Sequence, residues 1–191
     1  MVKLLVGVAV TLLLQTTSAI TAKSLKLNSN VRIRTRQEWV AQPPSKRLPS
    51  LPRAVPNIVV YQTATDTCKS HAQCVFRVRY LQTYDIESRS MSDIAYNFLV
   101  GGDGAIYEGR GWKFHGDHNE EYNSKSLGIA FIGTFANAKP TKIQSMTFNK
   151  LVNKASKEKR LKRDYKLLID KGSGDQLIAL VKNWPHFAGE V

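Results

Sequence analysis

Apolar and polar residues alternate along Ser92–Trp112, and this pattern predicts two short strands around a tight turn. Ile94, Tyr96, Phe98 and Val100 are separated by smaller or polar neighbours, as in a strand with one buried face. The run Gly101–Gly104 follows, and glycine and aspartate readily adopt the backbone angles that a hairpin turn requires. Ala105–Glu108 is therefore expected to return as the second strand.

The other periodic stretches predict strands that are interleaved with helices. Ile58–Tyr61 reads as a short buried strand, and the nearly all-apolar Leu127–Gly133 as a central one. A helix is predicted over Cys74–Asp85, with Phe76, Tyr80 and Tyr84 on one face. A second helix is predicted over Thr141–Lys159, capped by Thr141, with these residues facing inward: Ile143, Met146, Leu151, Val152 and Ala155. A strand over Tyr165–Ile169 and a helix over Asp175–Trp184, ended by Pro185, complete the predicted elements. Together they predict a single α/β domain with a central mixed β-sheet packed by about three helices.

The beginning of the chain has the pattern of a secretory signal. Lys3 precedes the apolar run Leu4–Leu14, and small residues follow at Thr17–Ala19 and Ala22. The apolar run is shorter than the roughly 20 residues that span a bilayer as a helix, although a membrane anchor remains the alternative. We expect a signal peptide over 1–22, a disordered segment over 23–33, a folded domain over 34–187 and an extracellular, secreted product.

The net charge and the two cysteines indicate which binding partners the chain favours and whether it carries a disulfide. The 191 residues carry a formal charge of +13, which favours anionic polymers, membrane surfaces or nucleic acid. Much of this charge lies in Lys150–Arg163, which also reads as a solvated helix face, and no nucleic-acid-binding motif is found. The two cysteines, Cys68 and Cys74, favour a disulfide in a secreted chain, with a free thiol pair as the alternative.

Two long motifs carry a resemblance to a known family. The runs DIAYNFLVGGDGAIYEGRGW and HGDHNEEYNSKSLGIAFIGTF resemble the peptidoglycan recognition proteins of insects, which are related to the type 2 N-acetylmuramoyl-L-alanine amidases. The resemblance runs from about Arg34 to Phe187 and implies an amidase-like fold. It also implies a disulfide at the position of Cys68 and Cys74. Among the insect members, the departures at ligand-binding positions resemble the LA type.

The positions that would hold a catalytic zinc depart from the family pattern. A zinc amidase needs three protein ligands and an open position for water. The first family ligand lies in a His-His-Thr run, which here is Tyr61-Gln62-Thr63, and a phenol is a poor zinc ligand at neutral pH. The other two ligands belong to a segment that here is shortened to Ile169–Gly174. We therefore expect no catalytic residues, no metal and no cofactor, with a loop site around His115 and His118 as the weaker alternative.

The resemblance also marks a candidate ligand groove. It implies groove positions at Gln62, Thr63, Tyr96, Arg110, His118 and Asn123. In relatives that prefer diaminopimelic acid stems, an arginine at the position of Arg110 meets the extra carboxylate. Each residue also has a structural alternative, because Tyr96 reads equally as a core aromatic and Arg110, His118 and Asn123 as residues held by local loop hydrogen bonds. Ser90-Met91 matches neither stem-specifying dipeptide of the family.

Three functions remain open on the sequence. The first is a secreted, non-catalytic recognition or signalling protein of innate immunity that binds peptidoglycan, of the diaminopimelic type if any, weakly. The second is a zinc-dependent N-acetylmuramoyl-L-alanine amidase, which the missing ligands disfavour. The third is a regulator that binds no peptidoglycan and acts through other peptidoglycan recognition proteins. Neither a nucleic acid nor a transmembrane segment is expected.

Overall fold

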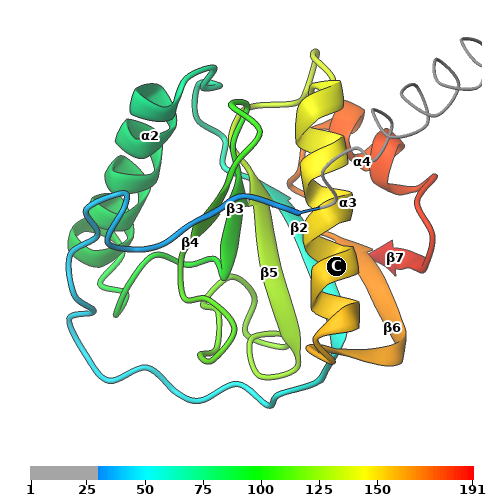
Figure 1. The fold of residues 1–191 in the computed structure, drawn as a ribbon, viewed down its shortest axis with the longest axis horizontal. Helices are drawn as coiled ribbons and strands as arrows, with labels where there is room; N and C mark the ends of the chain where they lie inside the picture. The colour runs from blue at the N-terminus through cyan, green and yellow to red at the C-terminus, as the bar shows by residue number, and fades with distance from the viewer. Residues whose placement is uncertain (1–29) are drawn as a thin grey trace, which may run out of the picture. The chain divides into compact units, whose positions relative to one another are not determined.

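The computed structural model describes residues 30–191, which form an α/β fold with helices packed on a mixed β-sheet (Figure 1). The expected signal peptide and most of the expected disordered segment lie outside the described residues. Residues 31–191 form one compact unit. The strands are β1 (Ile33–Arg34), β2 (Val55–Gln62), β3 (Phe98–Val100), β4 (Ile106–Glu108), β5 (Ser126–Phe131), β6 (Leu161–Ile169) and β7 (Phe187–Glu190), and the helices are α2 (His71–Thr83), the π-helical turn η1 (Tyr84–Ser88), α3 (Lys142–Lys157) and α4 (Asp175–Val181).

The seven strands form one sheet in the order β1-β4-β3-β5-β2-β6-β7. The β3–β4 pair is antiparallel and every other neighbouring pair is parallel, so the predicted mixed sheet is confirmed. The predicted strand Leu127–Gly133 is β5, which is fully buried and central in the order. The predicted hairpin is also confirmed, and Gly104 adopts a φ of 81° in its turn.

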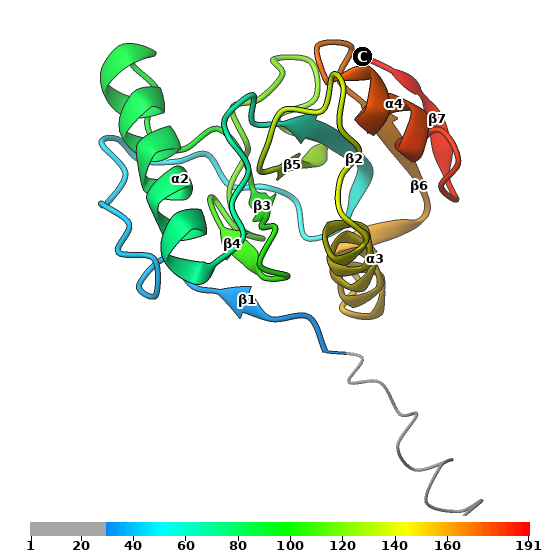
Figure 2. The same ribbon diagram turned by 90° about the horizontal axis from the view of Figure 1, so that it is seen from above.

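Alternate side chains of the sheet build two separate apolar layers. Ile58 and Val60 of β2 pack with α3 and α4, whereas Val59 and Tyr61 pack with α2. Figure 2 shows this division for α2 and α3, which lie on opposite sides of the sheet. Because both faces are covered, β3 is buried at all three residues, and the expectation of a single buried face from Ile94 to Val100 was wrong.

The first helix begins earlier than predicted and packs through a different stripe. Ser70 caps α2 by accepting a hydrogen bond from the amide of Gln73, so the helix starts at His71 rather than Cys74. Its buried side chains are Cys74, Val78, Leu81 and Gln82. The aromatic stripe of Phe76, Tyr80 and Tyr84 is 61%, 53% and 46% exposed, so the expectation that this stripe forms a packed face was wrong.

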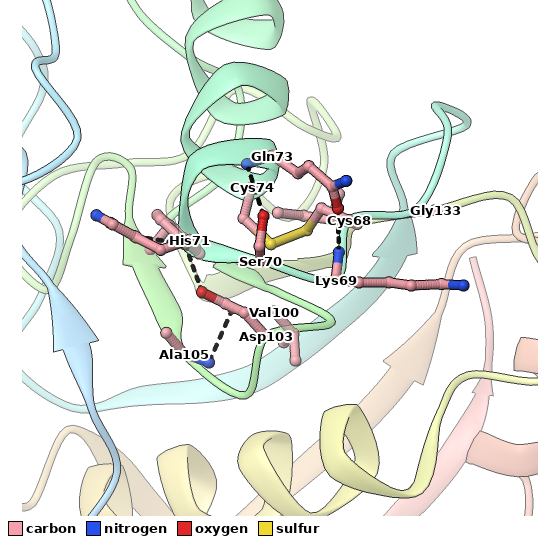
Figure 3. Close-up of a disulfide and its surroundings, with 12 residues drawn as sticks. Cys68, Lys69, Ser70, His71, Gln73, Cys74, Val100, Asp103, Ala105 and Gly133 are labelled. Carbon is pink, nitrogen blue, oxygen red and sulfur yellow. Dashed lines mark hydrogen bonds between the residues drawn. A yellow bond between two sulfur atoms is a disulfide. The ribbon is translucent and has the colours of Figure 1, made fainter.

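The predicted disulfide is confirmed and joins the start of α2 to the loop after β2 (Figure 3). Cys68 and Cys74 are both buried beside the β3–β4 turn. A Cβ atom at Gly102 would lie 2.0 Å from the carbonyl oxygen of Cys68, so this turn residue must be glycine. The bridge and the glycine-rich turn therefore fix α2 against the hairpin.

The helices on the other face begin where the sequence predicts. Thr141 and Gln144 form a reciprocal capping box at the start of α3, as expected for a threonine N-cap. Leu151, Val152 and Ala155 face the core as predicted, but Ile143 and Met146 are exposed and Phe148 takes their place. The last helix, α4, ends at Val181 rather than Trp184, and the chain then adds an edge strand, β7, that was not predicted.

Candidate functional site

An aromatic cluster lies on the face of the sheet that α2 also covers. Tyr61 of β2 is 5% exposed, and its ring centroid lies 5.4 Å from that of Tyr96 and 5.2 Å from that of His118. A hydrogen bond of 2.9 Å joins the Tyr61 hydroxyl to Nδ1 of His118. Tyr96 lies two residues before β3, and His118 belongs to the loop before β5. The sheet therefore brings together two of the predicted groove residues around a tyrosine.

Glycines make room for the His118 imidazole. A Cβ atom at Gly128 of β5 would lie 2.1 Å from Cδ2 of His118, and one at Gly116 would lie 2.2 Å from the same atom. The Oδ1 atom of Asn123 accepts hydrogen bonds from the amides of His118 and Asn119, at 2.9 and 3.0 Å. Asn123 therefore shapes the loop that presents His118. A glycine inside the apolar run of β5 was a readable sign of such a close approach, although Gly128 was not predicted as a site residue.

The cluster is electrically neutral at physiological pH. Burial, with a further contribution from the positive charge of Arg110, lowers the pKa of His118 to about 3. Burial raises the pKa of Tyr96 to about 12, and burial together with the Asp170 carboxylate raises the pKa of Tyr61 further above its ordinary value. The Nε2 atom of His118 is buried and has no hydrogen-bond partner among the described residues. The site can thus offer aromatic faces and neutral polar atoms, but no charge of its own.

Gln62 and Thr63 lie next along the chain and hold neighbouring loops. Gln62 donates through Nε2 to the carbonyl of Gly172 at 3.1 Å and accepts through Oε1 from the amide of Phe135 at 2.8 Å. The hydroxyl of Thr63 accepts from the amide of Gly133 at 3.0 Å and lies 2.8 Å from the hydroxyl of Thr65. In this structure, both side chains fix the loops that border the end of β2.

The side chain of Arg110 is committed to protein oxygens. It is 5% exposed, with Nε donating to the carbonyl of Ile94 at 2.7 Å and the terminal nitrogens donating at 3.2 Å to the carbonyls of His115 and Asp93 and to Oδ2 of Asp117. These bonds hold the His115–Asp117 segment that leads to His118. A role of Arg110 toward a ligand carboxylate stays a prediction, and it requires a guanidinium that first gives up part of this network.

The donor set does not fit the zinc that the amidase resemblance implies. Tyr61 is the residue that the resemblance assigns to the first family ligand, and its phenol keeps its proton because burial raises its pKa. Within residues 30–191, no three side chains of the His, Cys, Asp or Glu type lie close enough to share an ion. The segment Ile169–Gly174 passes from β6 to α4 through a short turn, and both cysteines are in the disulfide.

The chain is similar to proteins of the N-acetylmuramoyl-L-alanine amidase class. Residues 51–183 match the family model described as N-acetylmuramoyl-L-alanine amidase, which covers the strands from β2 to β6 and the helices α2, α3 and α4. Among solved structures, peptidoglycan recognition protein LE in complex with tracheal cytotoxin, a monomeric diaminopimelic acid-type peptidoglycan, has a TM-score of 0.80 at 39% identity over 82% of this chain and 95% of that one. The complex of tracheal cytotoxin with the ectodomains of the recognition proteins LCa and LCx gives a TM-score of 0.81 at 35% identity over 83% of this chain and 99% of that one.

Sequence relatives then specify the family. Peptidoglycan-recognition protein SD of Drosophila melanogaster is 34% identical over 88% of this chain and 94% of its own length. Peptidoglycan-recognition protein LC of the same fly is 39% identical over 83% of this chain, but the chain spans only 32% of that protein. The chain belongs to the peptidoglycan recognition protein family. Among residues 30–191, none of the helices has the length and apolar character needed to cross a bilayer.

Proposed function

We propose that this protein is a secreted recognition protein of innate immunity that binds peptidoglycan without cleaving it. The observation that carries the proposal is the Tyr61 hydroxyl bonded to a neutral His118, at the position that the resemblance assigns to the first zinc ligand. The relatives support the recognition half, because two solved neighbours are complexes with tracheal cytotoxin. The aromatic rings and amide groups around Tyr61 suit the sugar faces and peptide groups of a muropeptide.

The first prediction concerns metal content. After dialysis against metal-free buffer, the purified chain should retain less than about 0.1 zinc per molecule, because a structural or catalytic zinc site requires three or four well-placed ligands. Elemental analysis measures this directly. The variant Tyr61→His serves as the matched control, since one added imidazole still leaves the site two ligands short. One tightly held zinc per chain, together with chelator-sensitive release of muramyl peptide, would restore the amidase hypothesis.

The second prediction concerns peptidoglycan of the diaminopimelic type. We expect weak pull-down on the insoluble polymer. Part of the binding should be lost as the salt concentration rises, because salt screens the exposed charges of a chain that carries +13. The binding that remains at high salt is the salt-resistant component, which we assign to the groove. The variant Arg110→Lys keeps the charge but cannot make bidentate contacts, so we expect about a tenfold loss of the salt-resistant component. The exposed Arg163→Lys on β6 is the matched control.

A second function is favoured by one observation. Arg110, the arginine among the predicted groove residues, already donates to four protein oxygens and is not free to meet a ligand carboxylate. A regulator that acts through other peptidoglycan recognition proteins fits this arrangement, and the LCa–LCx complex is an example of such proteins assembling with one another. Pull-down that high salt abolishes completely in the wild type, combined with retention on an immobilised family member, would favour this regulator.

A further inference from the structure

A cavity of about 440 Å³ lies apart from the Tyr61–His118 cluster. Four segments that are distant in the sequence line it: the chain before β2, the approach to β3 at Asp93, the end of β4 with the loop that follows, and the turn between α3 and β6. Its volume falls within the roughly 300–1,000 Å³ that is typical of small-molecule sites. Of the predicted groove residues, it shares only Arg110.

The walls of this cavity are fixed by the fold rather than by a ligand. The ring of Trp112 packs at 4.3 Å from that of Phe98 in β3. The carbonyl of Lys113 accepts a hydrogen bond from the amide of Leu51 at 2.8 Å, which ties the loop after β4 to the chain before β2. The backbone of Arg160 is held from both sides, because its amide donates to the carbonyl of Ala155 and its carbonyl accepts from the amide of Val55. The cavity is thus preformed, which lowers the entropic cost of binding.

The lining combines apolar surface with cationic side chains. Pro44, Leu48, Trp112 and Phe114 supply hydrocarbon and aromatic surface. The guanidinium of Arg160 lies 5.8 Å over the Trp112 ring, and its Nε atom is buried without a hydrogen-bond partner in the part of the chain that the structure describes. A buried donor without a partner costs about 1–3 kcal/mol, so an acceptor brought by a ligand would be stabilising there.

The charges around the cavity do not balance. Arg36 is paired with Asp93, and Arg110 with Asp117. Within residues 30–191, neither Arg160 nor the exposed Lys113 has a carboxylate partner, and Glu108 is the lining carboxylate that has no ion pair. Two unpaired cations therefore face one unpaired carboxylate.

From this arrangement we propose that the cavity binds a small amphipathic anion, with an apolar body against Leu48 and Trp112 and an acidic head group on Arg160 and Lys113. A carboxylate, sulfonate or phosphate head satisfies the chemistry, because each offers oxygen acceptors to the Arg160 fork. Neither Tyr61 nor His118 lines this cavity, and the residues that carry the proposal, Arg160 and Lys113, are not among the predicted groove residues.

Fluorescence titration of the full chain with 8-anilino-1-naphthalenesulfonate at low salt tests the proposal. We expect one bound dye per chain, displaced by octanoate but not by 1-octanol at equal concentration. Arg160→Met, which keeps an apolar stem, should raise the dissociation constant about tenfold, and Lys113→Met should raise it less because its ammonium is exposed to screening. Glu108→Gln should lower the dissociation constant severalfold, because it removes the opposing charge.

Two controls separate this cavity from other apolar surface. Arg163→Met removes an exposed cation of β6 that does not line the cavity, and should leave the dissociation constant within about twofold because solvent and salt screen its charge. The double variant Phe76→Ser with Tyr80→Ser removes the exposed aromatic stripe of α2 and should also leave it unchanged. The proposal would be overturned by loss of dye binding in either control variant, or by equal displacement of the dye by octanol. It would also be overturned if phosphatidylglycerol vesicles displaced the dye and octanoate did not.

Discussion

Asp93→Ala is expected to destabilise the protein by about 3–5 kcal/mol, the cost of breaking a buried ion pair by removing one partner. The Asp93 carboxylate is fully buried and accepts from the amide of Ile94 at 2.8 Å and from Nε2 of Gln82 at 2.7 Å. Its second oxygen lies 2.9 Å from a terminal nitrogen of Arg36. The single side chain therefore joins the segment before β2, the end of α2 and the approach to β3.

Removing this carboxylate leaves the Arg36 guanidinium with two carbonyl partners, Gly109 and Gln42, and no counter-charge. Because small domains have only about 5–15 kcal/mol of stability in total, the variant should be close to unfolded at 37 °C. Urea unfolding with the disulfide intact measures the difference. Asp66→Ala breaks another aspartate–arginine pair, but Asp66 is 82% exposed, so this control should lose less than about 1 kcal/mol. Equal losses in the two variants would contradict the role assigned to Asp93.

The sequence predicted the sheet well because its strands have short-range signals. The apolar run of β5 and the glycine-rich turn before β4 are local patterns, and both elements were found where expected. The faces of the helices were harder to predict, because helical periodicity does not say which stripe meets the sheet. Phe76 and Tyr80 form a regular stripe, yet the helix is anchored through Cys74 by the disulfide and turns that stripe to solvent. The edge strand β7 was missed because it pairs with β6 in parallel. Parallel strands are not joined by a hairpin turn, so no short-range turn pattern marks the pair in the sequence.

The candidate site was predicted only in part for a similar reason. The resemblance marked Tyr96 and His118, and the structure brings both rings to Tyr61. What the sequence could not supply is how a polar side chain divides its bonds between the fold and a ligand. Arg110 illustrates this limit, because its four acceptors come from segments that only the folded chain brings together.

The His118 imidazole should make the protein markedly less stable as the pH falls. Its pKa of about 3 in the folded chain lies below the ordinary value of 6.5, so between these values the unfolded chain binds a proton that the folded chain does not. The contribution of the neutral His118 imidazole to the free energy of unfolding is therefore complete above pH 6.5, and it is lost progressively as the pH falls toward 3. At pH 4.5 the linkage amounts to about 2–3 kcal/mol relative to pH 7.

Comparison with His118→Gln isolates this contribution. Burial raises the pKa values of Asp85 and Asp170, which works in the opposite direction with pH, but both carboxyls are present in the two proteins and cancel in the difference. Urea unfolding at pH 7 and 4.5 should show the wild type losing about 2 kcal/mol more than the variant. His186→Gln, which alters an exposed ring stacked on Tyr165, should keep the wild-type pH dependence. In an NMR titration, a His118 ring signal that shifts near pH 6.5, rather than toward pH 3, would contradict the lowered pKa of this imidazole in the folded chain.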